Sequence, residues 1–231
     1  MTLLHHRDRI EGDLVIEVAF TDVSLSLGDA AEAGVRAEAL AQVAAATGAA
    51  PVLMHQVHGA DVDVVDLQRD GGPVACDAMV TDQQEVALLA RAADCVPVLL
   101  ADPATGWIAA VHSGRPGLAA GVVPAAVVRM RAEGADPSVA WIGPHVCGAC
   151  YEVPADLQEE VAALVPDARA TTSWGTPSLD LGAGVRAQLA AASITDVREV
   201  DVCTREDADW PSHRRDGAAA TRFAGVIWSH R

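Results

Sequence analysis

Lysine is absent from this sequence, so its 16 basic residues are all arginine, and they stand against 32 acidic residues. The formal net charge at pH 7 is therefore −16. Such a surface repels double-stranded nucleic acid and anionic membranes unless a local basic patch reverses the field. The arginine pairs Arg129/Arg131 and Arg214/Arg215 are small patches against so many acids. We therefore expect neither nucleic acid nor a membrane as a partner.

Aromatic residues are also scarce, at 3% of a chain that is 51% hydrophobic, so the core must consist mainly of Ala, Val and Leu. No apolar run approaches the about 20 residues that a membrane-spanning helix needs. The apolar runs at 86–90 and 96–101 are typical of buried strands instead. Residues 1–8 have neither the apolar stretch nor the small-residue cleavage site of an export signal, so we expect a cytoplasmic protein.

Internal repeats, low-complexity tracts and Pro/Ser-rich linkers are missing too, which predicts one domain over residues 1–231. β-Branched and apolar segments predict strands at 14–20, 51–57, 62–66, 74–81, 86–91, 96–101, 107–112, 139–142, 197–203 and 222–228. Apolar residues at helical spacing predict helices at 29–46, 114–131, 154–164 and 181–192. Because strands and helices alternate around hairpin-like strand pairs, the fold class is α/β, or α+β, with mixed β-sheets covered by helices.

The cysteine count is five, an odd number that predicts free thiols in a reducing compartment. Cys147 and Cys150 form a C-x-x-C pair, but no second pair completes a four-thiolate zinc site. A redox C-x-x-C normally opens a helix, whereas this one is followed by Tyr-Glu-Val-Pro at 151–154. We interpret the pair as buried thiols in a turn.

Three short segments, at 55–59, 93–97 and 111–114, each carry a residue that can bind a metal. Zinc favours imidazole nitrogen and thiolate sulfur, and three protein ligands leave a fourth position for water or substrate. His58, Cys95 and His112 have that composition. Cys95 begins one predicted strand and His112 ends the next, and in an antiparallel hairpin these two positions face each other. The sequence thus allows a mononuclear zinc site.

The first segment offers two histidines, of which we assign His58 to the site. Residues three apart on an extended strand point to opposite faces, so His55 and His58 should not share a site. His58 precedes Gly59, where the chain turns and its backbone can approach a ligand closely. His55 is then a strand histidine or a support for the ligands.

Seven stretches occur in one order along the chain: HQVHGADV (55–62), DAMVTD (77–82), ADCVPVLLADP (93–103), AAVHSG (109–114), IGPHVCGACYEV (142–153), CT (203–204) and SHRRDG (212–217). In this series the chain resembles the laccase-like polyphenol oxidase (YfiH-type) family, whose members are also described as purine nucleoside phosphorylases. The resemblance implies a YfiH-like layered sandwich. It also implies that His58, Cys95 and His112 bind one zinc ion per chain.

The resemblance further implies the reactions: phosphorolysis of adenosine, inosine, guanosine or methylthioadenosine, and deamination of adenosine. Nucleoside and phosphate are then the small-molecule partners, and a homo-oligomer is compatible with the sequence. For deamination, our hypothesis is that zinc lowers the pKa of a bound water towards about 7.

Two departures from the family pattern concern the substrate pocket. The family has an Arg- and Gly-rich loop before an S-L-N-L-G stretch, whereas here residues 20–23 run almost directly into Ser-Leu-Ser-Leu-Gly at 24–28. Ser26 stands where Asn is expected. The family's H-A-G-W-R-G becomes His-Ser-Gly-Arg-Pro-Gly at 112–117, which removes an aromatic residue and displaces an arginine by one position.

Phosphate recognition without lysine falls to arginine, whose guanidinium suits bidentate contact with phosphate. The candidate substrate-binding residues are Arg115, Arg214, Arg215 and Arg222. For Arg214 and Arg215 a solvated turn before Asp216 explains the sequence nearly as well. Asp77 and Asp94 are the candidate catalytic carboxylates, acting as acid or base or orienting a zinc-bound imidazole.

Three other functions remain open at this point. Two histidines and a cysteine also suit a blue-copper centre, so copper is the alternative metal and a polyphenol oxidase the alternative enzyme, although eight histidines are few for a multicopper cluster. Without metal, Cys95 as nucleophile and His112 as its base would make a hydrolase or amidase acting on cell-wall precursors. A degenerate member that binds a metabolite without turnover is the third.

Overall fold

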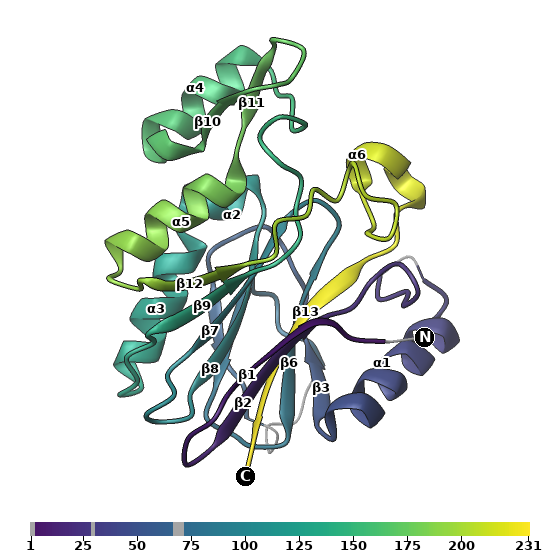
Figure 1. Ribbon diagram of the computed structural model, residues 1–231, viewed down its shortest axis with the longest axis vertical. Helices are drawn as coiled ribbons and strands as arrows, with labels where there is room; N and C mark the ends of the chain where they lie inside the picture. Colours follow the sequence, from purple (N-terminus) through teal and green to yellow (C-terminus); the bar gives the residue numbers. More distant parts are fainter. Residues whose placement is uncertain (1–2, 29–30, 67–71) are drawn as a thin grey trace.

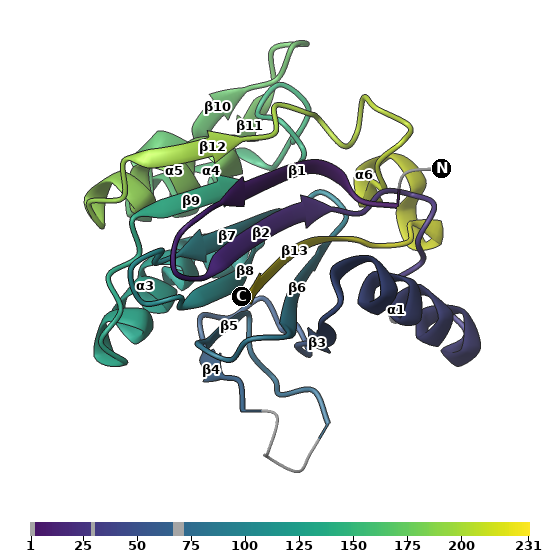
Figure 2. The same ribbon diagram turned by 60° about the horizontal axis from the view of Figure 1, so that its bottom comes forward.

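Two β-sheets lie face to face, and helices cover their outer sides (Figure 1, Figure 2). The computed structural model describes residues 3–28, 31–66 and 72–231. The five-stranded sheet has the order β1 (His5–Ile10), β2 (Val15–Phe20), β13 (Phe223–His230), β6 (Val86–Ala92), β3 (Ala50–Leu53). The six-stranded sheet has the order β12 (Asp196–Glu199), β9 (Val139–Ile142), β7 (Val96–Ala101), β8 (Ile108–Ser113), β5 (Ala78–Thr81), β4 (Val62–Val64).

Both sheets are mixed, as the sequence predicts. β3 pairs in parallel with β6, β4 with β5, and β12 with β9, whereas the other neighbours within the two sheets are antiparallel. A separate two-stranded ribbon joins β10 (Arg169–Thr171) to β11 (Pro177–Leu179). The α/β fold class with mixed sheets is confirmed.

The helices are α1 (Ala33–Thr47), α2 (Arg115–Ala120), α3 (Val122–Ala132), α4 (Ala155–Leu164), α5 (Leu181–Ala191) and α6 (His213–Asp216), with short 3₁₀ turns η1 (Pro166–Ala168) and η2 (Gly217–Ala219). α1 packs on the outer face of the five-stranded sheet, and α2, α3 and α5 cover the six-stranded one (Figure 1). None of the described helices is long and apolar enough to cross a membrane.

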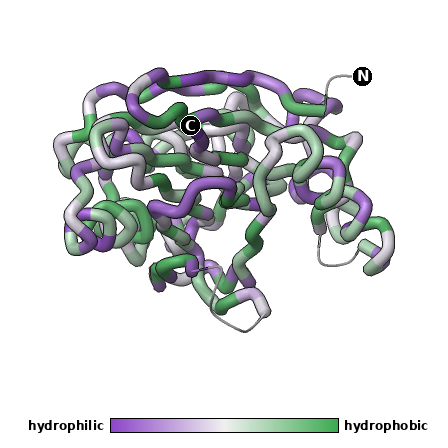
Figure 3. Tube along the Cα trace, turned by 90° about the horizontal axis from the view of Figure 1, so that it is seen from below, coloured by the Kyte–Doolittle hydropathy of each residue, from purple (hydrophilic) through white to green (hydrophobic). Residues whose placement is uncertain are grey.

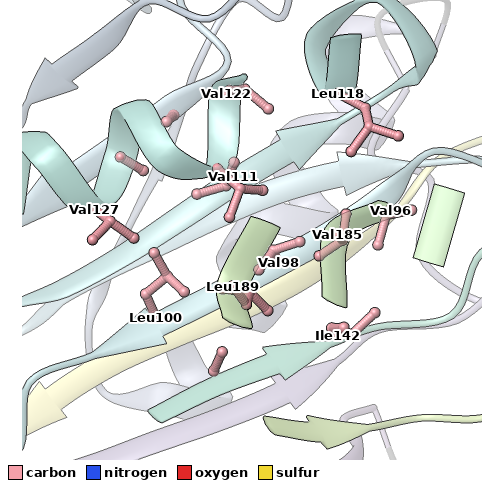
Figure 4. Packing of buried hydrophobic residues seen from close by; sticks show 14 of the residues in the cluster. Val96, Val98, Leu100, Val111, Leu118, Val122, Val127, Ile142, Val185 and Leu189 are labelled. Carbon is pink, nitrogen blue, oxygen red and sulfur yellow. The ribbon is translucent and has the colours of Figure 1, made fainter. Parts of the chain in front are cut away.

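The central strands β6, β7 and β8 are buried on both faces, which explains their long apolar runs. Along β7, Val98 and Leu100 point toward α3 and α5, where Val127 and Leu189 meet them (Figure 4). Leu99 points the other way, into the core between the two sheets. Side chains alternate between faces with a period of two, so one strand supplies two apolar layers.

The edge strand β1 is the most polar strand of the five-stranded sheet, with the sequence HHRDRI, and it is half exposed. Figure 3 shows hydrophilic residues concentrated along the segment that follows the N-terminus, with apolar strands beneath it. Charged side chains on an edge strand discourage pairing with another chain. Because β1 lacks the alternation of apolar and polar residues that marks a strand, the sequence did not predict it.

Several predicted boundaries were wrong for local reasons. The helix predicted at 114–131 is two helices, because Gly121 adopts a left-handed φ of 80° between α2 and α3. The strand predicted at 51–57 ends at Leu53, and the one predicted at 197–203 ends at Glu199. The start of the helix predicted at 29–46 lies partly outside the described residues, and its described part begins at Ala33.

The core between the sheets gives a direct test of this layering. Leu99→Ala removes a fully buried side chain, so we expect the free energy of unfolding to fall by about 2–5 kcal/mol. Val128→Ala on α3, where the side chain is 66% exposed, should change it by less than about 0.5 kcal/mol. Urea denaturation followed by tryptophan fluorescence measures both. Equal, small effects would contradict the position of Leu99.

Candidate metal centre

His58, Cys95 and His112 converge at one point, with one ligand atom from each lying within 4.8 Å of the others. The Cys95 Sγ lies 3.8 Å from His58 Nε2, and the two imidazole rings are 4.8 Å apart in an edge-to-face arrangement. A tetrahedral zinc ion would hold a sulfur and a nitrogen ligand about 3.5 Å apart. The three side chains therefore fit a zinc ion after small side-chain adjustments.

The β7–β8 hairpin brings two of these residues together. In the antiparallel pairing Val96 faces Ser113 and Pro97 faces His112. Cys95 directly precedes β7, so it meets the end of β8. The predicted hairpin geometry is confirmed, and its apolar body fixes the two ligands at one end of a buried sheet.

His58 lies in a loop; the sequence places it directly after a strand predicted at 51–57, whereas β3 ends at Leu53. Its backbone takes a left-handed φ of 62°, which turns the chain toward the hairpin. His55 is exposed and bridges to Ala75, so the structure leaves it outside the cluster. The assignment of His58 over His55 assumed that both lie on an extended strand, but β3 ends before both histidines.

Asp77 holds the loop and the hairpin together. Its buried carboxylate accepts hydrogen bonds from the backbone N–H groups of Val57 (3.1 Å), His58 (3.0 Å) and Gly59 (2.7 Å). It also pairs with His112 Nδ1 at 2.8 Å. Burial alone would raise the pKa of Asp77, but the hydrogen bonds from His112 and Gly59 outweigh it and hold the pKa below its ordinary value. The carboxylate is thus ionised at neutral pH.

His112 is a buried imidazole whose protonation state and tautomer suit a metal ligand. Burial lowers its pKa, and the opposing effect of Asp77 does not restore the ordinary value. Because an ionised carboxylate can only accept, the Nδ1 atom of His112 carries the proton and Nε2 keeps its lone pair. A carboxylate that orients a metal-binding imidazole is a recurrent feature of zinc sites.

Gly114, the residue after β8, lies against two side chains of the cluster. A Cβ atom at this position would lie 2.6 Å from His58 Cδ2 and 3.0 Å from Cys95 Sγ. Only glycine allows the imidazole and the thiol to approach the backbone this closely. Gly114, directly after β8, is therefore required by packing around these two side chains.

The cluster lies in a cavity of about 410 Å³, within the size range of small-molecule sites. Three of the four predicted substrate-binding arginines line it, namely Arg115, Arg214 and Arg222. Arg214 donates to the Glu152 carbonyl at 2.9 Å, and Arg222 donates to two neighbouring carbonyls. Arg115 makes no hydrogen bond or ion pair to any residue that the structure describes, so its guanidinium is the most available donor.

The side chains of two predicted site residues, Arg215 and Asp94, are occupied by hydrogen bonds within the protein. Arg215 is not among the described residues lining the cavity, and its guanidinium donates to the carbonyls of Thr204 and Trp210. Asp94 lines the cavity, but its carboxylate accepts from the Thr204 hydroxyl (2.7 Å) and the Arg214 backbone N–H (2.6 Å). Unlike Asp77, it holds segments together without touching an imidazole of the cluster.

Sequence reasoning missed several residues that line the cavity, among them Tyr151 and His213. Both belong to stretches that carry the family resemblance, IGPHVCGACYEV and SHRRDG, and that position is the signal that would have identified them. A second cluster was missed as well: Cys147, Cys150, Cys203 and Glu206 lie close enough to share a metal ion. The turn predicted for the C-x-x-C pair is present.

Zinc affinity tests the role of Asp77. Asp77→Asn keeps the side-chain size but removes the charge that orients His112, so we expect zinc binding to weaken about 10–100-fold. Asp82→Asn, at an exposed position just after β5, is the matched control and should bind as the wild type does. Competition with a chromophoric chelator measures both. Unchanged affinity in a folded Asp77→Asn protein would overturn this role.

Proteins named purine nucleoside phosphorylase are similar to this chain over most of their length. One from Streptomyces coelicolor is 56% identical over 180 residues, which cover 77% of this chain and 74% of that protein. One from Streptomyces griseus is 49% identical over 204 residues, covering 87% and 82%. One from Mycobacterium bovis is 44% identical over 179 residues, covering 77% and 71%.

Solved structures share the fold across almost the whole chain. YlmD from Geobacillus stearothermophilus has a TM-score of 0.85 at 25% identity, covering 94% of this chain and 92% of that one. A Neisseria meningitidis protein has a TM-score of 0.85 at 27% identity, covering 98% and 99%. The layered sandwich and the family resemblance are both confirmed. Residues 8–230 match the family described as multi-copper polyphenol oxidoreductase laccase, and the chain belongs to that family.

Proposed function

We propose that this chain is a zinc-dependent purine nucleoside phosphorylase that accepts adenosine, inosine, guanosine and methylthioadenosine and also deaminates adenosine. The relatives named purine nucleoside phosphorylase, at 44–56% identity, support the reaction class. The observation that carries the proposal is the juxtaposition of His58, Cys95 and His112 with an arginine-lined cavity. Candidate metal ligands and arginines suited to binding an anion therefore line the same cavity.

The donor set supports zinc as the metal. Two neutral imidazoles and one thiolate match zinc's preferred ligands and leave a fourth position open. Bound there, zinc would act as a Lewis acid that polarises an oxygen of the substrate or of water. Asp77 and Gly114 would keep the ligands in place by the contacts already described.

The arginines support phosphate as the second substrate. The chain carries a net charge of −16, yet Arg115, Arg214 and Arg222 all line this one cavity. Positive side chains collected in a cleft of an acidic protein raise the local concentration of anions. Arg115, whose guanidinium is the most available, is the first candidate for a bidentate contact with phosphate.

Tyr151 supports a purine as the organic substrate. Among the described residues lining the cavity it is the one phenol ring, and Arg214 lies 4.5 Å from its centroid. An aromatic face backed by a guanidinium offers a stacking surface for a base. Tyr151 would thus supply a flat face that the altered turn at 112–117 no longer provides.

The short segment that replaces the family's Arg- and Gly-rich loop ends beside this cavity. Ser26 hydrogen-bonds Thr221 at 2.8 Å, and the Leu27 carbonyl accepts from Arg91 at 3.0 Å. A Cβ on Gly28 would lie 3.6 Å from Arg222. The loop's usual arginines are therefore replaced, in this proposal, by side chains from α2, α6 and the segment before β13.

In phosphorolysis a phosphate oxygen bonds to C1′ of the ribose while the bond from C1′ to the purine nitrogen breaks. The electron pair of that bond stays on the base, which takes up a proton. The cavity arginines would hold the phosphate against one face of the sugar, and Tyr151 would hold the base. In deamination, water replaces the amino group of adenosine and ammonia leaves.

A metal-free cysteine hydrolase fits the cluster less well. Burial raises the pKa of the Cys95 thiol to about 12, and the carboxylates of Asp94 and Asp77 add to the rise against the opposing charge of Arg222. Such a thiol is almost fully protonated at neutral pH, so it is a poor nucleophile. A bound cation would instead stabilise the thiolate directly.

A copper oxidase also fits less well. Among the residues that the structure describes, His58, Cys95 and His112 form one cluster, and the other contains no histidine. Met54 and Met79 lie in the core between the sheets, so neither supplies the weak axial ligand of a blue-copper centre. A multicopper cluster would need further histidines near the first three.

Nucleoside assays with inorganic phosphate test the proposal. We expect purified protein to convert inosine and phosphate into hypoxanthine and ribose 1-phosphate, and Cys95→Ala to abolish the conversion. Arg222→Ala should raise the KM for phosphate about tenfold or more, because a hydrogen bond to a charged group is worth about 1.5–3 kcal/mol. Arg129→Ala, at a half-buried arginine on α3 outside the cavity that pairs with Glu133, should leave it unchanged.

Chromatography of the products measures all of these outcomes. No base release from any of the four nucleosides by protein that retains its metal would contradict the phosphorylase and favour a binder without turnover. An unchanged phosphate KM in Arg222→Ala would remove Arg222 from the anion site.

A further inference from the structure

A second group of metal-ligating side chains lies outside the first cluster. Cys147, Cys150, Cys203 and Glu206 each present one donor atom, and the four atoms lie within 4.8 Å of one another. The three cysteines are free thiols. Cys150 Sγ lies 3.4 Å from the Glu206 carboxylate. Sulfur and oxygen ligands of one tetrahedral zinc ion are about 3.5 Å apart, so this pair already has the spacing of two ligands.

Backbone hydrogen bonds hold the segments that carry these four side chains together without a metal ion. A parallel bridge joins His145 to Cys203, with backbone hydrogen bonds from His145 N to Val202 O (3.2 Å) and from Thr204 N to His145 O (3.1 Å). The C-x-x-C pair lies in a turn closed by Cys150 N and Cys147 O at 3.0 Å. Residues 147–150 and 203–206 are thereby held next to each other.

Hydrogen bonds inside the cluster suit a thiolate site. The backbone N–H of Cys147 donates to Cys203 Sγ at 3.4 Å. An N–H that points at sulfur stabilises the ionised form and orients it toward a cation. Arg205 donates to the Cys150 carbonyl at 3.3 Å and brings positive charge near a donor set that would carry excess negative charge.

The surroundings favour a cation over an anion. An adjoining cavity of about 340 Å³ is lined by Cys147, Cys203, Glu206 and three further carboxylates, Asp180, Glu199 and Asp201. Arg186 is the one arginine among its described lining residues, and it is paired with Glu199 at 2.7 Å. A cleft of this sign concentrates cations.

We propose that Cys147, Cys150, Cys203 and Glu206 bind a second, structural zinc ion. Four protein ligands close the coordination sphere, which is the arrangement of structural zinc sites, and three soft thiolates with one carboxylate favour zinc over calcium or magnesium. This site stands on its own residues and does not depend on the proposed phosphorylase activity.

The position of this second site gives it a function in the architecture of the cavity. Tyr151 follows Cys150 directly, and Thr204 follows Cys203 and donates to Asp94 at 2.7 Å. Arg214 reaches across to the Glu152 carbonyl at 2.9 Å. A zinc ion that ties 147–150 to 203–206 would therefore brace the wall that carries Tyr151 and Arg214.

Metal analysis of untagged protein, purified without chelators, tests the proposal. We expect two zinc ions per chain in the wild type, one in Cys203→Ser and one in Cys95→Ser. Cys76→Ser, at a buried cysteine outside both clusters, is the matched control and should keep two. Glu206→Gln changes an exposed ligand only, so it tests the same site if the cysteine variant misfolds. We expect it to lose one zinc ion more readily than the wild type during dialysis.

Cobalt substitution identifies the ligands independently of activity. The near-ultraviolet thiolate-to-cobalt band should be about three times as strong for the second site as for the first, because three thiolates replace one. One zinc in both the wild type and Cys203→Ser would overturn the proposal. A disulfide among the three cysteines in freshly purified protein, or iron with labile sulfide, would overturn it too. Loss of metal in Cys95→Ser but not in Cys203→Ser would support the first site and rule out the second.

Discussion

The carboxylate of Asp77 connects the two parts of the chain that make the candidate metal centre. A buried carboxylate must be fully hydrogen-bonded to stay charged, and Asp77 satisfies this through three consecutive backbone amides and one imidazole. The amides define the left-handed turn of His58, and the imidazole belongs to the end of β8. One charged group thus fixes the position of one histidine and the tautomer of the other. Its loss would affect both ligands at once.

The apolar sheets make this polar site possible by holding its supports rigid. β7 and β8 are buried along their whole length, so Cys95 and His112 extend from a body that cannot shift without opening the core. The cavity chemistry is then supplied by segments that end at this edge of the sheet: Arg115 from α2, Arg214 from α6 and Tyr151 after the C-x-x-C turn. In an acidic chain without lysine, this gathering of arginine is a local reversal of charge.

The sequence predicted what depends on local pattern and missed what depends on contacts between distant segments. The strand Val96–Ala101 was predicted to the residue, because a buried strand is a continuous apolar run bounded by polar turns. The polar edge strand His5–Ile10 was missed, since its partner strand and not its own pattern makes it a strand. Similarly, Cys203 is 53 residues beyond Cys150, and only the bridge to His145 brings them together. The hairpin that joins Cys95 and His112 was predictable because it is local.

Anomalous diffraction at the zinc absorption edge, from crystals of untagged protein, tests the central claim most directly. We predict an anomalous peak about 2.3 Å from Cys95 Sγ and about 2.0–2.1 Å from a nitrogen of each imidazole of His58 and His112. We also predict that Asp77 contacts His112 Nδ1 in those crystals. Crystals of protein that cleaves nucleosides, with these three residues in place and no anomalous peak between them, would contradict the account.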